Sequence, residues 1–402
     1  MSVAALEVIL AADRLLTPAG ELTPGWLSLS GGHIEAVGAG RPPADRPLID
    51  LRDRICAPGF LDLHVHGGAG AQVNADCAAA AREAVGRIAA FHLAHGTTAL
   101  LPTTVSDTPE RTLATVAGVA AAVDDAGAAR VLGVHLEGPW LAPERAGAQD
   151  RTALRAIDAG EVERLLQAAQ GRLRIVTLAP ELPGAEQLIE RLVAARVIVS
   201  IGHTEADYEV AKRAVKLGAR HFTHLFNAMP PLSHRRPGPV GVALTETGVA
   251  VELIADGHHV HPAMLSIAFD QAEQAILITD ASAAAGLPEG GAARLGRLEV
   301  VVAGGAVTLA ADRSTLAGSA LTMDAAVRTL VERTDVDLAE ALQAASTTPA
   351  DAIGRPDLGR LQAGAAADLV VLDGDLEVAA TLVDGRALYD RDGVFTGRSS
   401  ET

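Results

Sequence analysis

The stretch Gly59-Phe60-Leu61-Asp62-Leu63-His64-Val65-His66-Gly67 is an apolar strand pattern that carries two histidines just before a glycine-rich segment. Alternate residues of a β-strand point to the same face, so His64 and His66 can reach one metal ion side by side. Histidine is the commonest metal ligand among side chains. Two histidines at this spacing also occur on ordinary half-exposed strands, so the rest of the chain has to distinguish the two interpretations.

Four later segments follow the same pattern, because each is an apolar run that carries a potential metal ligand near its end. The runs are 131–139 with Glu137, 198–204 with His203, 221–229 with His224 and 275–281 with Asp280. Each of these polar residues alone is typical of a helix cap or a loop. Five strand ends that present ligands at one edge are instead typical of a metal centre.

Three further strand-like stretches bring the number of expected parallel strands to eight, and helical patterns separate most of them. The further strands are 98–104, 175–180 and 249–255, and the helical patterns are 77–95, 109–126, 160–169, 185–195, 206–218 and 262–273. Strands that alternate with helices form βαβ units, and eight such units close into a barrel. The sequence therefore predicts an α/β fold with a (β/α)8 TIM-like barrel over residues 58–357.

The two chain ends carry short alternating runs separated by glycine and proline turns. Neither end alone has enough strands for a stable sandwich, so we expect residues 1–57 and 358–402 to pair into one small composite β-sandwich domain. The glycine-rich stretch 286–316 contains two short strand patterns and predicts an inserted β-hairpin near the mouth of the candidate site. Helical patterns follow at 322–333 and 338–353.

The composition excludes several classes of partner. The chain has 33 Lys and Arg residues against 50 Asp and Glu residues, a formal net charge of −17, which argues against nucleic acid and against an anionic membrane. We see neither a signal-peptide pattern nor an apolar stretch long enough for a membrane span. The two cysteines, Cys56 and Cys77, offer no disulfide framework, and we therefore expect a cytoplasmic protein.

An anionic small substrate would need a local cationic pocket in so acidic a chain. His234-Arg235-Arg236-Pro237-Gly238, just after the sixth strand, is the candidate for that pocket. The same residues are also typical of a solvated turn with two surface arginines, and the composition leaves both interpretations open.

Several longer strings occur together in the chain: PGFLDLHVHG, HLEGPWL, GHT, THLFNAMPPLSHRRPG, ADGHHV, TDASAAAG, LAGSALTM and LGRLQAGAAADLVVLD. With these strings the chain resembles the amidohydrolase superfamily, and HLEGP with THLFNAM resembles its N-acetylglucosamine-6-phosphate deacetylase family. The resemblance implies a metal-dependent hydrolase barrel that cleaves the acetamide of N-acetyl-D-glucosamine 6-phosphate, an amino-sugar phosphate, in amino-sugar catabolism. Acetate and glucosamine 6-phosphate are the implied products.

The resemblance also implies a set of metal-binding residues: His64, His66, Glu137, His203, His224 and Asp280. One divalent ion is implied between Glu137, His203 and His224, and a second at the histidine pair with Glu137 as a bridge. We expect Zn²⁺, although Fe²⁺, Mn²⁺ and Co²⁺ suit the same ligand types. Amide hydrolysis needs a proton for the departing nitrogen, and the resemblance assigns this proton transfer to Asp280.

Contacts to the substrate follow from the same resemblance. It implies that the phosphate meets Asn227, the backbone N–H of Ala228, Arg235 and His259. It further implies that Arg235 comes from the neighbouring subunit of a homodimer. Gln149 is a departure, because the family usually carries a histidine here that contacts the substrate carbonyl. The Gln149 amide can donate a hydrogen bond but cannot become cationic, which leaves the rate and the preferred N-acyl sugar open.

Alternative functions remain within and outside the enzymes. N-acetylgalactosamine 6-phosphate or an N-acetylated amino acid are the alternative substrates of such a hydrolase. Dihydroorotase-like or urease-like chemistry is disfavoured, because those relatives carry a carboxylated lysine on strand four and residues 175–181 offer none. A non-catalytic scaffold with this barrel would typically lack metal ligands, whereas all five ligand-bearing strand ends are filled here.

Overall fold

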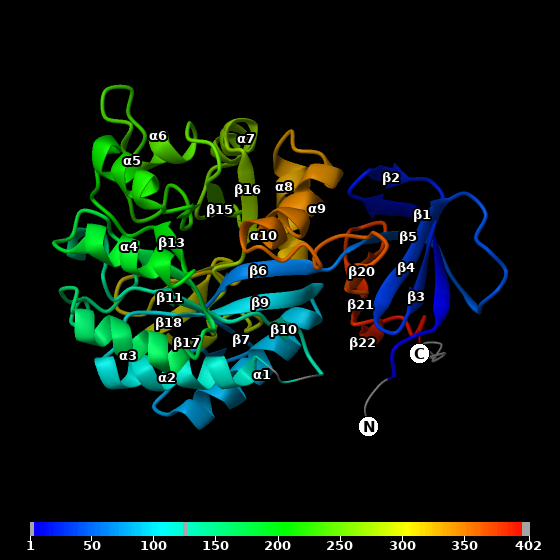
Figure 1. The fold of residues 1–402 in the computed structure, drawn as a ribbon, viewed down its shortest axis with the longest axis horizontal. Coiled ribbons are helices and arrows are strands. Elements are labelled where there is room, and N and C mark those ends of the chain that lie inside the picture. The colour runs from blue at the N-terminus through cyan, green and yellow to red at the C-terminus, as the bar shows by residue number, and fades with distance from the viewer. Residues whose placement is uncertain (1–3, 124, 126, 396–402) are drawn as a thin grey trace.

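A computed structural model describes residues 4–123, 125 and 127–395 of the chain. Within these residues eight parallel strands form a barrel in which each strand pairs with the next one (Figure 1). The strands are β6 (Phe60–Val65), β9 (Thr97–Thr104), β11 (Val134–Glu137), β12 (Leu173–Leu178), β13 (Ile198–Ile201), β14 (His221–Phe222), β15 (Ala250–Ile254) and β16 (Gln274–Ile278). A short strand, β10 (Arg130–Val131), adds to the edge of β9. The predicted (β/α)8 barrel is confirmed.

The barrel closes between its first and last strands through hydrogen bonds at their ends. The N–H of Asp280 donates to the carbonyl of His64 at 2.9 Å, and the N–H of His66 donates back to the segment after β16 at 2.9 Å. The buried Asp62 carboxylate accepts the N–H of Thr279 at 3.2 Å and its hydroxyl at 2.5 Å. Closure therefore places the histidine pair of β6 beside the aspartate that follows β16.

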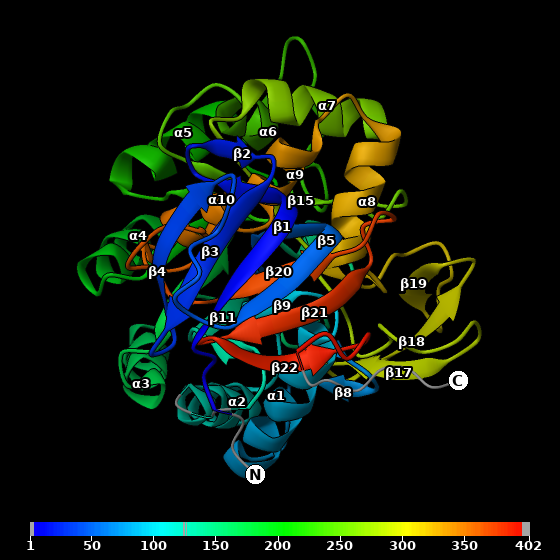
Figure 2. The same cartoon turned by 90° about the vertical axis from the view of Figure 1, so that its right-hand side faces the viewer.

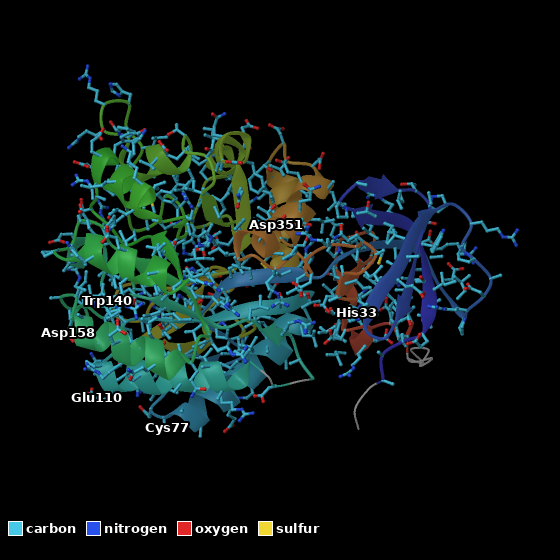
Figure 3. The ribbon with its side chains drawn as sticks, in the orientation of Figure 1. His33, Cys77, Glu110, Trp140, Asp158 and Asp351 are labelled. Atoms are coloured by element: carbon cyan, nitrogen blue, oxygen red, sulfur yellow. The ribbon has the colours of Figure 1, made fainter. Side chains whose placement is uncertain are left out.

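Helices cover the outside of the barrel (Figure 1). They are α1 (Ala78–Leu93), α2 (Pro109–Ala122), α3 (Ala159–Ala169), α4 (Ala185–Ala194), α5 (Tyr208–Leu217), α6 (Gly238–Ala243), α7 (Pro262–Gln271), α8 (Met323–Arg333), α9 (Leu338–Ala344) and α10 (Thr347–Ala352), with a 3₁₀ turn η1 at Pro143–Arg145. Side-chain caps from the sequence start several of them. Thr108 and Asp158 accept the N–H of the third residue of α2 and α3 respectively, and Figure 3 labels Asp158 at the outside of the barrel.

The helical pattern at 338–353 forms two helices, α9 and α10, rather than one. Pro349 has no N–H to donate, and in a continuous helix its ring would clash with the carbonyl one turn earlier. The chain leaves the helical conformation at Ser346, where φ is −138° and ψ is −74°. The helix that restarts at Thr347 therefore holds Pro349 in its first turn, where no N–H is needed.

The two chain ends form one further sheet with the order β22-β21-β20-β5-β1-β3-β4, and β2 pairs with β1. Its strands are β1 (Val8–Thr17), β2 (Gly20–Leu22), β3 (Gly25–Ser30), β4 (His33–Ala39), β5 (Leu48–Pro58), β20 (Leu369–Leu372), β21 (Val378–Val383) and β22 (Arg386–Asp390). Figure 2 shows the N-terminal and C-terminal strands side by side. Antiparallel pairing of Cys56 with Val371 joins the two ends. The domain limits at 57/58 and 357/358 remain our proposal.

The stretch after β16 contains a three-stranded antiparallel sheet where the sequence predicted a two-stranded hairpin. Its strands are β17 (Ala292–Leu295), β18 (Leu298–Ala303) and β19 (Ala306–Leu309). The segment Ala292–Leu295 has no strand-like alternation of its own, so its strand conformation depends on pairing with β18. Two short strands, β7 (Gly67–Gly68) and β8 (Ala71–Gln72), pair beside the histidine-bearing strand. No helix within the described residues has the length and apolar character needed to cross a membrane.

Candidate metal centre and substrate cavity

The strand ends predicted to carry ligands meet at one edge of the barrel, and their side chains form two adjacent groups. Glu137, His203 and His224 form the first group, and His64, His66 and Asp280 form the second. All six residues are buried. The structure therefore brings together every metal-type residue that the sequence singled out.

The first group is the tighter one around a single carboxylate oxygen. Glu137 Oε1 lies 3.2 Å from His203 Nε2 and 3.2 Å from His224 Nε2. The two imidazole nitrogens lie 3.1 Å from each other. Such a triangle of one oxygen and two nitrogens is the ligand set of a divalent metal site.

The second group faces the other side of the same glutamate. His64 Nε2 lies 3.1 Å from His66 Nε2, and His66 Nε2 lies 3.1 Å from Asp280 Oδ1. Glu137 Oε1 is 3.5 Å from His64 Nε2, while Oε2 is 3.5 Å from His66 Nε2. The Glu137 carboxylate therefore contacts histidines of both groups.

The ring tautomers show that these groups fit a cation. Nδ1 of His66 donates to the Thr103 carbonyl at 3.0 Å, and Nδ1 of His203 donates to the Arg145 carbonyl at 2.7 Å. Because a carbonyl oxygen only accepts, each neutral ring carries its proton on Nδ1 and presents a lone pair on Nε2. Lone pairs that face carboxylate oxygens in a buried space need positive charge between them, which divalent ions supply.

The electrostatics of Glu137 agree with this arrangement. Burial works against its ionisation, but His203 and His64 outweigh burial and hold the pKa of the Glu137 carboxyl well below its usual range. Burial also works against charge on His66, yet Asp280 and Glu137 raise the pKa of His66 above its usual value. The carboxylates therefore draw positive charge into this space, as protons when no ion is bound.

The backbone at the ligand positions is strained. His203, His224 and Asp280 have φ values of 46°, 29° and 49°, in the left-handed region that non-glycine residues rarely occupy. Gly138, directly after the ligand glutamate, has φ of 76°, and a Cβ there would lie 2.3 Å from Ser106 Oγ. Strain of this kind persists only where surrounding contacts hold it, and it is concentrated at functional sites.

A cavity of about 280 Å³ opens onto these ligands. Four further residues that the sequence assigned to substrate binding line it: Gln149, Asn227, Ala228 and His259. Four residues to which the sequence analysis assigned no role also line it: Leu295, Ser314, Thr315 and Leu316. The nearby LAGSALTM string, which begins at Leu316, was the signal that could have drawn attention to them.

Two of the substrate-binding candidates differ in where they lie. His259 Nδ1 pairs with Asp256 Oδ2 at 2.7 Å, so the imidazole is fixed at the cavity wall. Arg235 does not line this cavity; it lines a separate surface pocket of about 630 Å³ together with Arg145 and Tyr208. Within one chain, the structure therefore separates Arg235 from the other phosphate candidates.

Gln149 contacts one of the candidate metal ligands, Glu137, directly. Its Oε1 accepts the N–H of Ser106 at 2.7 Å, and its Nε2 donates to Glu137 Oε2. The orientation of the amide is unambiguous, because a backbone N–H only donates and an ionised carboxylate only accepts. Gln149 therefore helps to fix the oxygen of Glu137 that faces the second group.

Comparison with known proteins places the chain in a family. A model described as the amidohydrolase family matches residues 55–388. An N-acetylgalactosamine-6-phosphate deacetylase of Escherichia coli O157:H7 is 39% identical over 94% of this chain and 98% of its own length. The human N-acetylglucosamine-6-phosphate deacetylase is 40% identical over 85% of each chain.

A solved structure agrees with these sequence matches. An N-acetyl-D-glucosamine-6-phosphate deacetylase mutant of Mycobacterium smegmatis, in complex with N-acetyl-D-glucosamine-6-phosphate, superimposes with a TM-score of 0.89. It is 40% identical and covers 95% of this chain and 99% of its own. The barrel, the shared ligand cluster and these matches lead to one conclusion: this chain belongs to the amidohydrolase family.

Proposed function

We propose that this protein is a metal-dependent deacetylase that hydrolyses the acetamide of N-acetyl-D-glucosamine 6-phosphate, giving glucosamine 6-phosphate and acetate in amino-sugar catabolism. The observation that best supports this proposal is that a single cavity is lined both by the candidate ligands around Glu137 and by Asn227, Ala228 and His259. Amide chemistry and recognition of a charged sugar therefore have their groups in the same space. The named activities of the relatives support the same substrate class.

The proposed cofactor is one or two divalent ions per chain, with Zn²⁺ expected first and Fe²⁺, Mn²⁺ or Co²⁺ fitting the same donors. Glu137, His203 and His224 would hold one ion, and His64, His66 and the shared glutamate the other. When bound, such an ion polarises the amide carbonyl and lowers the pKa of water towards ~7.

Asp280 is the proposed carrier of the proton. Its backbone is held on both sides, because its N–H donates to the His64 carbonyl and its own carbonyl accepts the Ser319 N–H at 2.7 Å. The carboxylate is thereby fixed with Oδ1 3.1 Å from His66 Nε2. From this position it takes the proton of the attacking water and delivers it to the departing nitrogen, which cannot leave as an amine without it.

Gln149 is the proposed donor to the substrate carbonyl. A primary amide carries two N–H groups, and one of them already donates to Glu137. The second can serve a carbonyl oxygen in the cavity that Gln149 lines. Since an amide does not titrate, this donor would keep its charge state at every pH at which the protein is folded.

We assign the phosphate to Asn227, the Ala228 backbone and His259 of one chain and to Arg235 of a neighbouring chain. The position of Arg235 supports this division, because Arg235 lines a separate surface pocket and not the cavity of its own chain. The protein is therefore proposed to be a homodimer. Arginine suits this task because its planar fork binds phosphate oxygens in pairs.

The proposed location is the cytoplasm. Both cysteines are free: Cys56 is buried, and Cys77 is exposed near the start of α1, at the outside of the barrel in Figure 3. An exposed free thiol suits a reducing compartment.

The test is acetate release by the metal-loaded protein from four compounds: N-acetylglucosamine 6-phosphate, N-acetylgalactosamine 6-phosphate, unphosphorylated N-acetylglucosamine and an N-acetylated amino acid. We expect the highest kcat/KM on N-acetylglucosamine 6-phosphate. Equal release from phosphorylated and unphosphorylated sugars would refute the proposed substrate. No release from any of the four compounds would refute the proposed deacetylase activity.

N-acetylgalactosamine 6-phosphate is the second candidate substrate. The relative from Escherichia coli O157:H7, which matches 94% of this chain, carries that activity in its name. The two sugars differ only in the orientation of the C4 hydroxyl, so the ratio of their kcat/KM values decides between them.

A further inference from the structure

A third cluster of metal-type side chains lies beside the metal centre, formed by His64, His135 and Glu252. It does not make a further metal site, because His135 uses both ring nitrogens within the protein. Its Nδ1 donates to the Leu63 carbonyl at 2.9 Å, and its Nε2 faces the Thr177 hydroxyl at 2.8 Å. The task of the Glu252 carboxylate must therefore lie in its protein contacts.

Glu252 touches a ligand of each proposed ion. It lies on β15, and none of its surface is exposed. Its Oε2 accepts the Nδ1–H of His64 at 3.0 Å and the backbone N–H of His224 at 3.2 Å. Its own backbone carbonyl accepts the N–H of Leu225 at 2.8 Å. Oε1 has no hydrogen-bond partner among the described residues.

The two side-chain contacts act on different properties of the ligands. Because Oε2 accepts the His224 N–H, it is an acceptor toward His64 as well, whichever protonation state Oε1 takes. The proton of His64 therefore sits on Nδ1, and the lone pair on Nε2 faces Glu137 and Asp280. The tautomer that can bind a metal is thus selected by Glu252.

The contact to His224 acts on the backbone. Its φ of 29° is a left-handed conformation that neighbouring contacts must hold in place. The side chain of Glu252 binds the N–H of His224, and its carbonyl binds the next N–H, of Leu225. Glu252 of β15 therefore holds the turn after β14 that presents His224.

We propose that Glu252 is a positioning residue for both metal sites, and that ion binding at the His64 and His66 pair depends on it most. His64 takes its tautomer from Glu252, whereas His203 in the other group has its own anchor at the Arg145 carbonyl. An effect of Glu252 on catalysis rests on the proposed metal-dependent function. Its effect on ion affinity is independent of that function, because ion affinity is measured without substrate.

The test compares Glu252→Leu and Glu252→Gln with the unchanged protein by Zn²⁺ titration against a competing chelator and by elemental analysis. Outer partners of metal-binding histidines change metal affinity by about ten- to a hundredfold. We expect Glu252→Leu to lose that much affinity for the ion at the His64 and His66 pair. Glu252→Gln keeps the size and one acceptor oxygen, so it should recover most of the loss, to within about fivefold.

Asp368→Asn is the matched control, because Asp368 is a buried carboxylate that lies outside the metal centre and pairs with Arg130. It should leave both Zn²⁺ affinities unchanged. The Co²⁺-loaded protein gives a second readout, since its visible absorption reports ligand geometry and a role confined to folding would not shift it. We expect Glu252→Leu to change this absorption.

A folded Glu252→Leu protein that binds both ions as tightly as the unchanged protein, with an unaltered Co²⁺ spectrum, would overturn the proposal. Where Glu252→Leu fails to fold, Glu252→Asp decides, since the shorter side chain cannot reach both N–H groups: unchanged ion affinity in that variant overturns the proposal as well. Absence of acetate release from the unchanged protein would refute the proposed function while leaving the ion-binding result intact.

Discussion

Two regions of this molecule bury carboxylates, and the two regions neutralise them in opposite ways. Where the barrel meets the chain-end sheet, Arg130 pairs with Asp368 at 3.0 Å and with Asp384 at 2.9 Å. At the ligand edge of the barrel, Glu137 and Asp280 have no lysine or arginine within ion-pair distance among the described residues, and their partners are histidines. The first region carries its own cation, and the second leaves room for one from outside.

The partner of a buried carboxylate, rather than its burial, therefore separates a structural role from a functional one. A guanidinium is charged at every physiological pH. Burial works against the charge of Arg130, but Asp368 and Asp384 outweigh burial and raise the pKa of Arg130. Histidines exchange protons for metal ions instead, so the ligand edge of the barrel can take up and release charge.

The largest expected effect is on stability, from breaking the permanent pair. Arg130→Met leaves the buried Asp368 without its cation, and breaking a buried pair costs about 3–5 kcal/mol. Because the Arg130 side chain is 25% exposed, we expect about 3 kcal/mol, measured as the free energy of unfolding in urea. Metal content and kcat should stay unchanged. A loss below about 1 kcal/mol would show that the two regions do not differ in this way.

The next effect is on turnover, from removing the proposed proton carrier of the candidate metal centre. Asp280→Asn keeps the size and an oxygen ligand but removes the basic carboxylate. We expect kcat to fall at least about a hundredfold, the usual scale for a general acid–base, while metal content and substrate binding persist. Turnover within about threefold of the unchanged protein at full metal loading would contradict this role, because such a change corresponds to less than about 1 kcal/mol of activation free energy.

A smaller effect tests whether an arginine supplied by a second subunit binds the phosphate of the substrate. Loss of a charge-assisted contact costs on the order of 1.5–3 kcal/mol. Arg235→Ala should therefore lower kcat/KM for the 6-phosphate by about ten- to a hundredfold and leave the unphosphorylated sugar nearly unaffected. Arg236→Ala, which changes the neighbouring arginine of the same surface pocket, is the control. Equal losses on both sugars would make Arg235 structural.

A further effect, which changes no residue, concerns pH. In the ion-free protein, Glu137 and Asp280 raise the pKa values of His203 and His66 against the opposing effect of burial. These protons must leave before an ion binds, so metal affinity should fall as pH falls, by about tenfold per pH unit for each proton displaced. Chelator competition between pH 8 and pH 6 measures it. An affinity that does not change with pH would mean that the ion displaces no proton.

The same pKa shifts predict that the stability of the ion-free protein falls as pH rises, whereas its metal affinity rises. A histidine whose pKa is raised by folding contributes stability at low pH, and this contribution is lost as pH rises through the raised pKa. Urea unfolding of chelated protein should therefore show lower stability at pH 8 than at pH 6 from this source. Added Zn²⁺ should reverse the order, because the ion replaces the protons.

Local patterns in the sequence were enough to predict the barrel and its candidate metal ligands. Alternation along each strand, with a polar residue at its end, is a property of a few adjacent residues, so His64, His66, Glu137, His203 and Asp280 were found from the chain alone. The same local reasoning missed the break at Pro349 within 338–353, because a helical pattern of apolar residues masked the missing N–H.

Which of these side chains meet, and which residues position them, depends on the tertiary structure. Glu252 lies in an apolar strand pattern that says nothing of its partners, and its role depends on His64 and His224, which come from two other strands. Closure of the barrel between β6 and β16 sets those distances. Sequence periodicity fixes the face on which a side chain points, whereas contacts between distant segments depend on how the whole barrel closes, which no short stretch of sequence encodes.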